Sequence, residues 1–263
     1  PVIVLNGQKN IISETSPALR LAEIHKIVLV DDEEKWDEET AGKMLTIIQR
    51  LKDILYKFGY RKSWKVVLTG KLLSGDAEVV VEAEKDGRVG TVRFSKAAFQ
   101  YSNSDSNFYS NRLYRAILRG FFNDRVLLET ILKERSGVAT GYADPRDEFQ
   151  DFTLDELQYL VTVFEDLPPG FHHIPGLEKV VRRKNGLTNP LHPGAPAIAW
   201  VGSGYIEFMD FAFQSGSEDY IRRLIAHEMT HFVWHKIFSE ETKSQFMKLS
   251  GWSKTLPTGG VSA

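Results

Sequence analysis

The segment from Ile225 to Val233 constrains the fold more than any other part of the chain, because it contains the pattern His-Glu-x-x-His. On an α-helix, residues four apart lie on one face about one turn along. The imidazoles of His227 and His231 can therefore reach a single metal ion. Most of the surrounding residues are apolar, which is not expected of a helix that faces solvent on all sides. The segment predicts a partly buried helix with a metal site on one face.

Zinc is the metal that this pattern indicates. Two neutral imidazoles at this spacing suit tetrahedral Zn2+, and the pattern is typical of zinc-dependent peptidases. Glu228 follows the first histidine directly, so its carboxylate can take a proton from a metal-bound water. We therefore expect His227 and His231 as zinc ligands and Glu228 as the catalytic base. The alternative is a helix that carries two surface histidines by chance.

Composition excludes several other classes of function. The chain has 263 residues and a formal net charge of −2, without a long basic block, so neither nucleic acid nor an anionic membrane is an expected partner. No apolar run reaches the ~18 residues that a membrane span needs. The absence of cysteine excludes disulfides and thiolate metal ligands. The chain starts at Pro1 with no signal-type segment, so we expect a processed product, an excised domain or the ordered part of a longer protein.

Hydrophobic periodicity predicts an α+β chain in two parts, residues 1–105 and 106–263. The boundary is expected in the Ser/Asn-rich stretch 101–111. The elements predicted for the N-terminal α+β subdomain are a strand over 22–30, a helix over 36–58, a strand over 65–68 and a hairpin of strands 77–84 and 89–94.

The second part is predicted to place the motif helix beside a small mixed sheet. Thr153 and Glu156 form a capping box, which marks the start of a helix. The elements expected in this part are helices over 111–119, 124–134 and 154–166, a short strand over 180–183, paired strands over 197–201 and 205–213, and the motif helix over 218–238.

The strand over 205–213 is the candidate for binding substrate. A strand at the edge of a sheet can pair with the backbone of an extended peptide, so Tyr205 and Ile206 are predicted to lie along it. The alternative is that this strand only packs on the motif helix. His172 and His173 follow a Pro-Gly turn and could line the cleft. The alternative is that they, like His192, are plain surface residues in loop-like sequence.

A zinc hydrolase needs a third protein ligand, and the chain does not supply an obvious one. His235 lies eight residues after His227, about 12 Å along the same helix, which is too far for a shared ion. Glu240 and Glu241 are the only acidic residues after His231, and they follow the helix too closely to fold back easily. We expect the third ligand beyond Ala263, with Glu240 or Glu241 as the fallback.

The catalytic region resembles the anthrax lethal-factor-like metallopeptidases, a family that includes secreted proline-directed clostridial peptidases. The resemblance covers about residues 150 to 252: the run from Phe164 to Arg183, then Tyr205-Ile-Glu-Phe, then the motif at His227–His231. Two departures are Phe232-Val233-Trp234-His235, where the family has a small residue followed by an acid, and the unmatched N-terminal hundred residues.

The resemblance implies a zincin-like domain, zinc on both motif histidines and the motif glutamate as base. It also implies a third ligand glutamate on a later helix, after a tyrosine, and favours a secreted bacterial protein or a domain of a larger one. The expected function is a zinc endopeptidase that cleaves protein or peptide substrates through a metal-activated water. The alternatives are a catalytically incomplete zincin-like domain that acts as an interaction module, and a hydrolase of non-peptide amides. Oligomeric state and cleavage specificity are not indicated.

Overall fold

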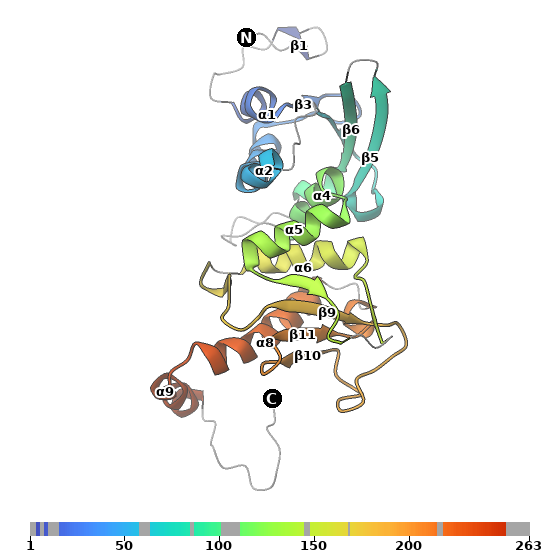
Figure 1. Cartoon of the computed structure of the whole chain (residues 1–263). Helices are drawn as coiled ribbons and strands as arrows, with labels where there is room; N and C mark the ends of the chain where they lie inside the picture. Colours follow the sequence, from blue (N-terminus) through green and yellow to red (C-terminus); the bar gives the residue numbers. More distant parts are fainter. Residues whose placement is uncertain are drawn as a thin grey trace. The chain divides into compact units, whose positions relative to one another are not determined.

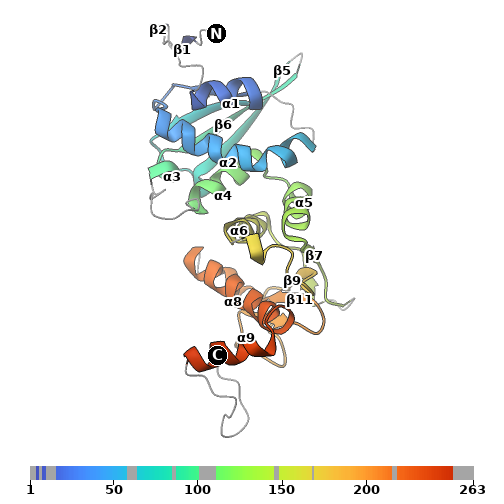
Figure 2. The same ribbon diagram turned by 90° about the vertical axis from the view of Figure 1, so that its left-hand side faces the viewer.

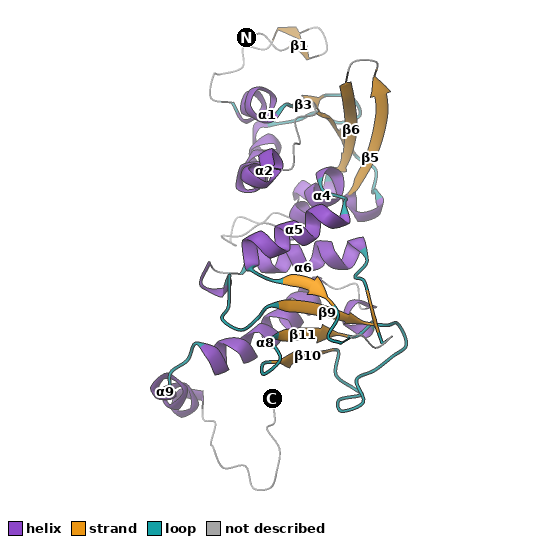
Figure 3. Ribbon diagram, in the orientation of Figure 1, coloured by secondary structure: helices purple, strands orange, loops and turns teal. Residues whose placement is uncertain are grey.

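A computed structural model describes residues 4–5, 8–9, 16–57, 64–84, 87–100, 111–144, 148–167, 169–214 and 218–250. In these residues the chain is α+β, as predicted (Figure 3). It divides into two compact units, residues 1–132 with 153–166 and residues 133–152 with 167–263. The boundary predicted at residue 105 lies outside the described residues.

The first unit is built on a four-stranded sheet in the order β3-β4-β6-β5, in which only β5 runs antiparallel to its neighbour (Figure 1). A separate two-stranded pair precedes it. The elements are β1 (Val4–Leu5), β2 (Gln8–Lys9), α1 (Pro17–His25), β3 (Ile27–Val30), α2 (Glu38–Lys57), β4 (Trp64–Thr69), η1 (Ser74–Asp76), β5 (Ala77–Glu84), β6 (Gly87–Ser95), α3 (Ala97–Gln100), α4 (Asn111–Phe121) and α6 (Leu154–Asp166). Helix α5 (Arg125–Ser136) crosses the division between the units.

The strand predicted over residues 22–30 is wrong in its first half, which belongs to helix α1. Ser16 caps this helix, because its Oγ accepts a hydrogen bond from the Leu19 amide at 3.2 Å, and Pro17 occupies the first turn. Lys26 ends the helix in the left-handed conformation with φ 58°. Only residues 27–30 then form the strand.

The other elements predicted in this unit are confirmed where the structure describes them. The long helix, the short strand and the hairpin are α2, β4 and β5–β6. The capping box of α6 is also present: the Thr153 amide donates to Glu156 Oε2 at 2.9 Å, and the Glu156 amide donates to Thr153 Oγ1 at 3.2 Å.

The second unit contains a mixed sheet in the order β10-β11-β9-β7, with β8 also paired to β9 (Figure 1). Its elements are β7 (Ala139–Gly141), β8 (Phe149–Gln150), η2 (Pro169–Phe171), β9 (Lys179–Arg183), β10 (Ala197–Trp200), β11 (Tyr205–Phe208), α7 (Phe211–Gln214), α8 (Glu218–Lys236) and α9 (Glu240–Ser250). The predicted pairing of the strands around Gly202-Ser203-Gly204 is confirmed, and the pairing is antiparallel. Residues 211–213, predicted as strand, instead belong to α7.

The two faces of this sheet differ in character. Ile206 and Phe208 of β11 are completely buried on one face, where Phe208 packs against Phe152 and Phe213. We call this the inner face. Side chains alternate along a strand, so Tyr205 and Glu207 lie on the opposite, outer face. Helix α8 lies along β10, and Figure 2 shows it beside the strands β9 and β11.

Among the described helices, none combines the length and apolar character that crossing a bilayer requires.

Candidate metal centre

Helix α8 carries the motif, and its buried side chains form one continuous stripe. The buried residues are Ile221, Leu224, Ile225, Glu228, Met229, Phe232 and Val233. His227 and His231 lie beside this stripe and are exposed, with ring centroids 5.0 Å apart and ring planes at 88°. Two accessible imidazoles at this separation, one turn apart, are suited to binding one metal ion from the same side.

Glu228 is the one charged residue in this stripe and is only 5% exposed. Its carboxylate accepts a hydrogen bond from the backbone amide of Ala199 in β10. Burial disfavours the ionised form and raises the pKa of Glu228 to about 7, while the Ala199 amide acts in the opposite direction. A carboxyl group with a pKa near neutrality can both accept and release a proton at neutral pH.

The backbone amide of Ala199 lies at the open edge of the sheet, on the side of β10 that faces away from β11. The Pro196 carbonyl accepts a hydrogen bond from the Met209 amide at 3.0 Å, and the Trp200 carbonyl accepts one from the Gly204 amide at 2.8 Å. The backbone groups of residues 196 and 200 therefore face β11. In an antiparallel pair, successive residues face alternate sides, so the N–H and C=O of Ala199 face away from β11. In the described part of the chain no strand pairs with that edge of β10.

The surroundings of His231 favour its neutral form, which is the form that binds metals. Its pKa lies below the ordinary value because surrounding protein desolvates the ring, and because His227 and His235 would repel a second positive charge. Neutral imidazole is the form in which histidine ligates zinc. The electrostatics of the helix therefore agree with a metal-binding role for His231.

The third ligand is not found among the described residues, where no group of three His, Asp or Glu side chains is arranged to hold a metal. Glu240 and Glu241 instead belong to the first turn of α9, which Ser239 caps through the Thr242 amide at 3.1 Å. Glu240 Oε1 forms an ion pair with Lys243 Nζ at 2.8 Å. Neither fallback glutamate is brought to the two histidines. Residues 251–263 lie outside the described residues.

The predicted backbone pairing of a peptide with Tyr205 and Ile206 needs correction. Strand β11 is paired on both sides, antiparallel to β10 and parallel to β9, so it has no free edge. Ile206 is fully buried, and the Tyr205 ring lies 6.2 Å from that of Trp200 on the outer face. The open edge beside Glu228 belongs to β10 instead.

The loop histidines are not part of the motif site. His173 is exposed, adopts φ 55°, and donates its amide to the Ser136 carbonyl at 3.2 Å. His192 is exposed, with its ring 6.2 Å from that of Trp200. His172 is half-buried beside His173.

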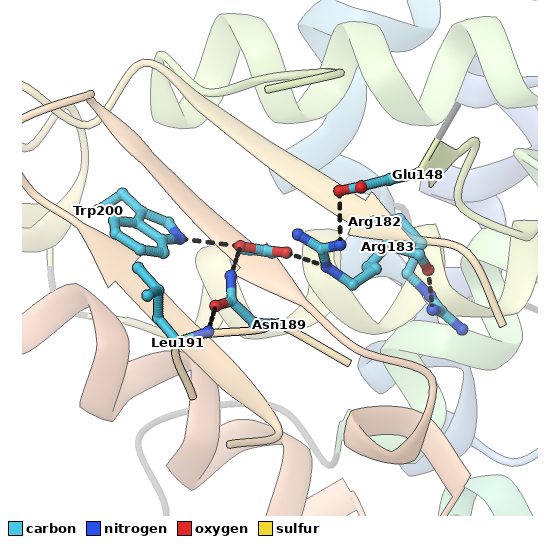
Figure 4. Close-up of polar contacts among 7 residues, drawn as sticks. Glu148, Arg182, Arg183, Asn189, Leu191 and Trp200 are labelled. Carbon is cyan, nitrogen blue, oxygen red and sulfur yellow. Dashed lines mark hydrogen bonds and ion pairs between the residues drawn. The ribbon is translucent and has the colours of Figure 1, made fainter. Parts of the chain in front are cut away.

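Sequence reasoning missed a buried polar network on the outer face, which Figure 4 shows. Glu207 is 1% exposed, and its carboxylate accepts hydrogen bonds from Asn189 Nδ2 at 2.9 Å, Trp200 Nε1 at 2.9 Å and Arg183 Nε at 2.5 Å. Arg183 also contacts Glu148 Oε2 through Nη1 at 2.9 Å. These contacts join β9, β10, β11 and the loop between β9 and β10.

Truncating Glu207 should strongly destabilise this unit. In the Glu207→Ala protein the buried Arg183 would lose the buried carboxylate that pairs with it, which lowers the unfolding free energy by about 3–5 kcal/mol. Glu148→Ala is the matched control, because it removes the other carboxylate on Arg183 at a position that is 36% exposed. Exposed partners contribute at most about 1 kcal/mol. Chemical denaturation measures both variants, and equal losses would contradict a special role for Glu207.

No protein-family model, curated protein or solved structure matches the chain. The function must therefore be argued from the chemistry of the residues described above.

Proposed function

We propose that this chain carries the active-site helix of a zinc-dependent endopeptidase with a zincin-like fold, similar to the lethal-factor-like metallopeptidases. One observation carries the proposal. The buried carboxylate of Glu228 lies at the open edge of β10, next in sequence to the first of two exposed histidines that are one helical turn apart. This combination brings together a base, a pair of imidazole ligands and a place for an extended backbone.

The residues present fit a zinc ion in the donor chemistry they offer. His227 and His231 would hold it through imidazole nitrogens, and His231 is kept neutral by its surroundings. When bound, zinc supplies a Lewis acid that activates water and stabilises negative charge on a carbonyl oxygen. We propose that the third ligand comes from outside the described residues, in a segment that follows Ala263.

Glu228 supplies the proton transfers. Its pKa near 7 allows it to take a proton from the attacking water and then pass that proton to the leaving amine. The Ala199 amide fixes the orientation of the carboxylate, so the base is in place before the substrate arrives.

The β10 edge supplies the substrate-binding surface. The Ala199 carbonyl faces this edge, as its amide does, and can accept a hydrogen bond from the backbone N–H of an extended peptide. Pairing through the backbone would place the peptide antiparallel to β10, beside the carboxylate of Glu228. This arrangement replaces the pairing with residues 205 and 206 that the sequence predicted.

Zinc content tests the ligands directly. The natural chain that continues beyond Ala263, prepared without chelators, should contain zinc, and His227→Ala or His231→Ala should reduce its zinc affinity by at least 100-fold, because each removes a direct ligand. His235→Ala is the matched control, since this histidine lies one turn further along the same helix. Elemental analysis and competition with a chromophoric chelator give the affinities. An unchanged affinity in His227→Ala would show that the assignment is wrong.

The position of the third ligand can be tested by chain length. If that ligand follows Ala263, the chain that ends there should hold zinc weakly and cleave no peptide, and a natural chain that continues further should do both. Equal zinc affinity and activity in the two chains would direct attention back to Glu240 and Glu241, each of which can be replaced by Gln. Weak zinc binding without cleavage in both chains would favour the alternative function, an incomplete zincin-like domain that acts as an interaction module.

A further inference from the structure

Trp200 forms a fixed aromatic surface at the end of the open β10 edge. It is half-buried and points to the outer face, where its indole Nε1 donates to the buried carboxylate of Glu207 at 2.9 Å. Its ring centroid lies 6.2 Å from that of Tyr205 and 6.2 Å from that of His192. A ring restrained by a buried hydrogen bond and two ring contacts presents the same surface to every molecule that approaches the edge.

The hydrogen-bonding pattern of β10 determines which residue of a bound peptide would meet this ring. The backbone N–H and C=O of Ala199 face the open edge, whereas the backbone N–H and C=O of Trp200 face β11. An antiparallel peptide would therefore meet Trp200 in a non-hydrogen-bonded pair, the type in which facing Cα atoms are closest, about 4.5 Å apart.

The antiparallel direction proposed above fixes the order of the peptide residues along β10. The residue opposite Trp200 lies one position N-terminal to the residue opposite Ala199, and the residue opposite Ile198 lies one position C-terminal to it. Side chains alternate, so these two outer residues of the peptide project onto the outer face of the sheet. The residue between them projects to the inner face.

We propose that Trp200 is a specificity-determining residue that selects a large apolar or aromatic side chain on the peptide residue immediately N-terminal to the one paired with Ala199. Glu207 is the positioning residue that holds the indole in place. This inference rests on the proposed function, because it takes the occupant of the edge to be the extended substrate. Apolar side chains are favoured because the indole offers a broad apolar surface and its N–H is already bonded to Glu207.

A positional-scanning library of fluorogenic peptides tests this proposal in the zinc-loaded natural chain that continues beyond Ala263. Each position is varied in turn among Phe, Leu, Ala, Asp and Lys. At the peptide position one residue N-terminal to the residue paired with Ala199, the wild type should prefer Phe or Leu to Ala about tenfold. Trp200→Ala should remove this preference and leave the preferences at the other peptide positions unchanged. Ile198→Ala is the matched control on the same strand and face. It should change selectivity two residues further toward the C-terminus of the peptide.

A binding measurement gives a second readout that does not depend on turnover. Fluorescence anisotropy with the Glu228→Gln protein should show about tenfold weaker binding of the preferred peptide when Trp200→Ala is added. Trp200→Phe keeps a ring and should retain most of the preference. Glu207→Gln keeps an acceptor for the indole and should also retain it. Thermal unfolding of each variant confirms that it is folded. If Trp200→Ala does not fold, Trp200→Gln takes its place, because it removes the aromatic surface and keeps an amide N–H that can donate to Glu207; a retained preference for Phe or Leu would then overturn the role of Trp200.

The outcomes separate this inference from the proposed function. A selective loss at one peptide position supports the role of Trp200. Cleavage with the same preference in wild type and Trp200→Ala overturns that role and leaves the endopeptidase intact. Absence of both cleavage and peptide binding in the zinc-loaded natural chain that continues beyond Ala263 overturns the two together.

Discussion

Glu228→Gln should lower peptide turnover by about three orders of magnitude, because a positioned general base contributes roughly 10²–10⁴-fold to such reactions. The amide has nearly the same shape as the carboxylate and can still accept a hydrogen bond from Ala199, but it cannot take a proton from water. Steady-state cleavage of a fluorogenic peptide measures the change. Zinc content and peptide affinity should stay close to those of the wild type, which distinguishes loss of the base from loss of the site.

Glu178→Gln provides the matched control, since Glu178 is an exposed glutamate of the same unit. Its turnover should equal that of the wild type. Full turnover in Glu228→Gln with zinc bound would rule out Glu228 as the base and would remove the main support for the proposed mechanism.

In the metal-free protein, the same carboxyl group should make stability depend on pH. Its pKa is raised from 4.5 to about 7 in the folded state, so folding favours the protonated form. The resulting stabilisation is complete below about pH 4.5 and is lost as the pH rises through 7. At 1.36 kcal/mol for each pH unit, the loss is about 3 kcal/mol of unfolding free energy.

Glu228→Gln should lack this dependence, so the difference between its unfolding free energy and that of the wild type isolates the contribution of Glu228. The comparison is needed because the lowered pKa of His231 acts in the opposite direction, adding stability as the pH rises toward 6.5. Urea denaturation between pH 4.5 and 8, with a chelator present, gives both curves. Parallel curves would show that Glu228 is not desolvated in the folded protein.

The sequence was most informative where structure depends on neighbouring residues. The amphipathic pattern of α2, the Thr153–Glu156 capping box and the Gly-Ser-Gly turn between β10 and β11 are local signals, and each predicted its element. The motif predicted helix α8 and the spacing of its histidines for the same reason. Helix α1 also begins with a local signal, Ser16-Pro17, but the apolar residues that follow this start are equally typical of a strand.

The sequence was least informative where structure depends on distant segments. Pairing of β9 with β11 joins residues more than twenty positions apart, and it is this pairing that leaves the open edge on β10. Glu207 stands among apolar residues in a short strand, where alternation predicts an exposed side chain. It is buried because Arg183 and Asn189, from other segments, satisfy its carboxylate. Nothing in a single sequence identifies these partners.

The open edge of β10 has a consequence for solubility. A bare strand edge presents unpaired amides and carbonyls to any other extended chain, including a second copy of the same protein, and so can seed aggregation. Here the edge strand is only four residues long, and the outward amide of Ala199 is bonded to a carboxylate. A short edge with one occupied amide can still bind a peptide, but it offers few free backbone groups for strand pairing between two copies of the protein. The residue proposed to carry the chemistry would then also protect the folded protein against self-association.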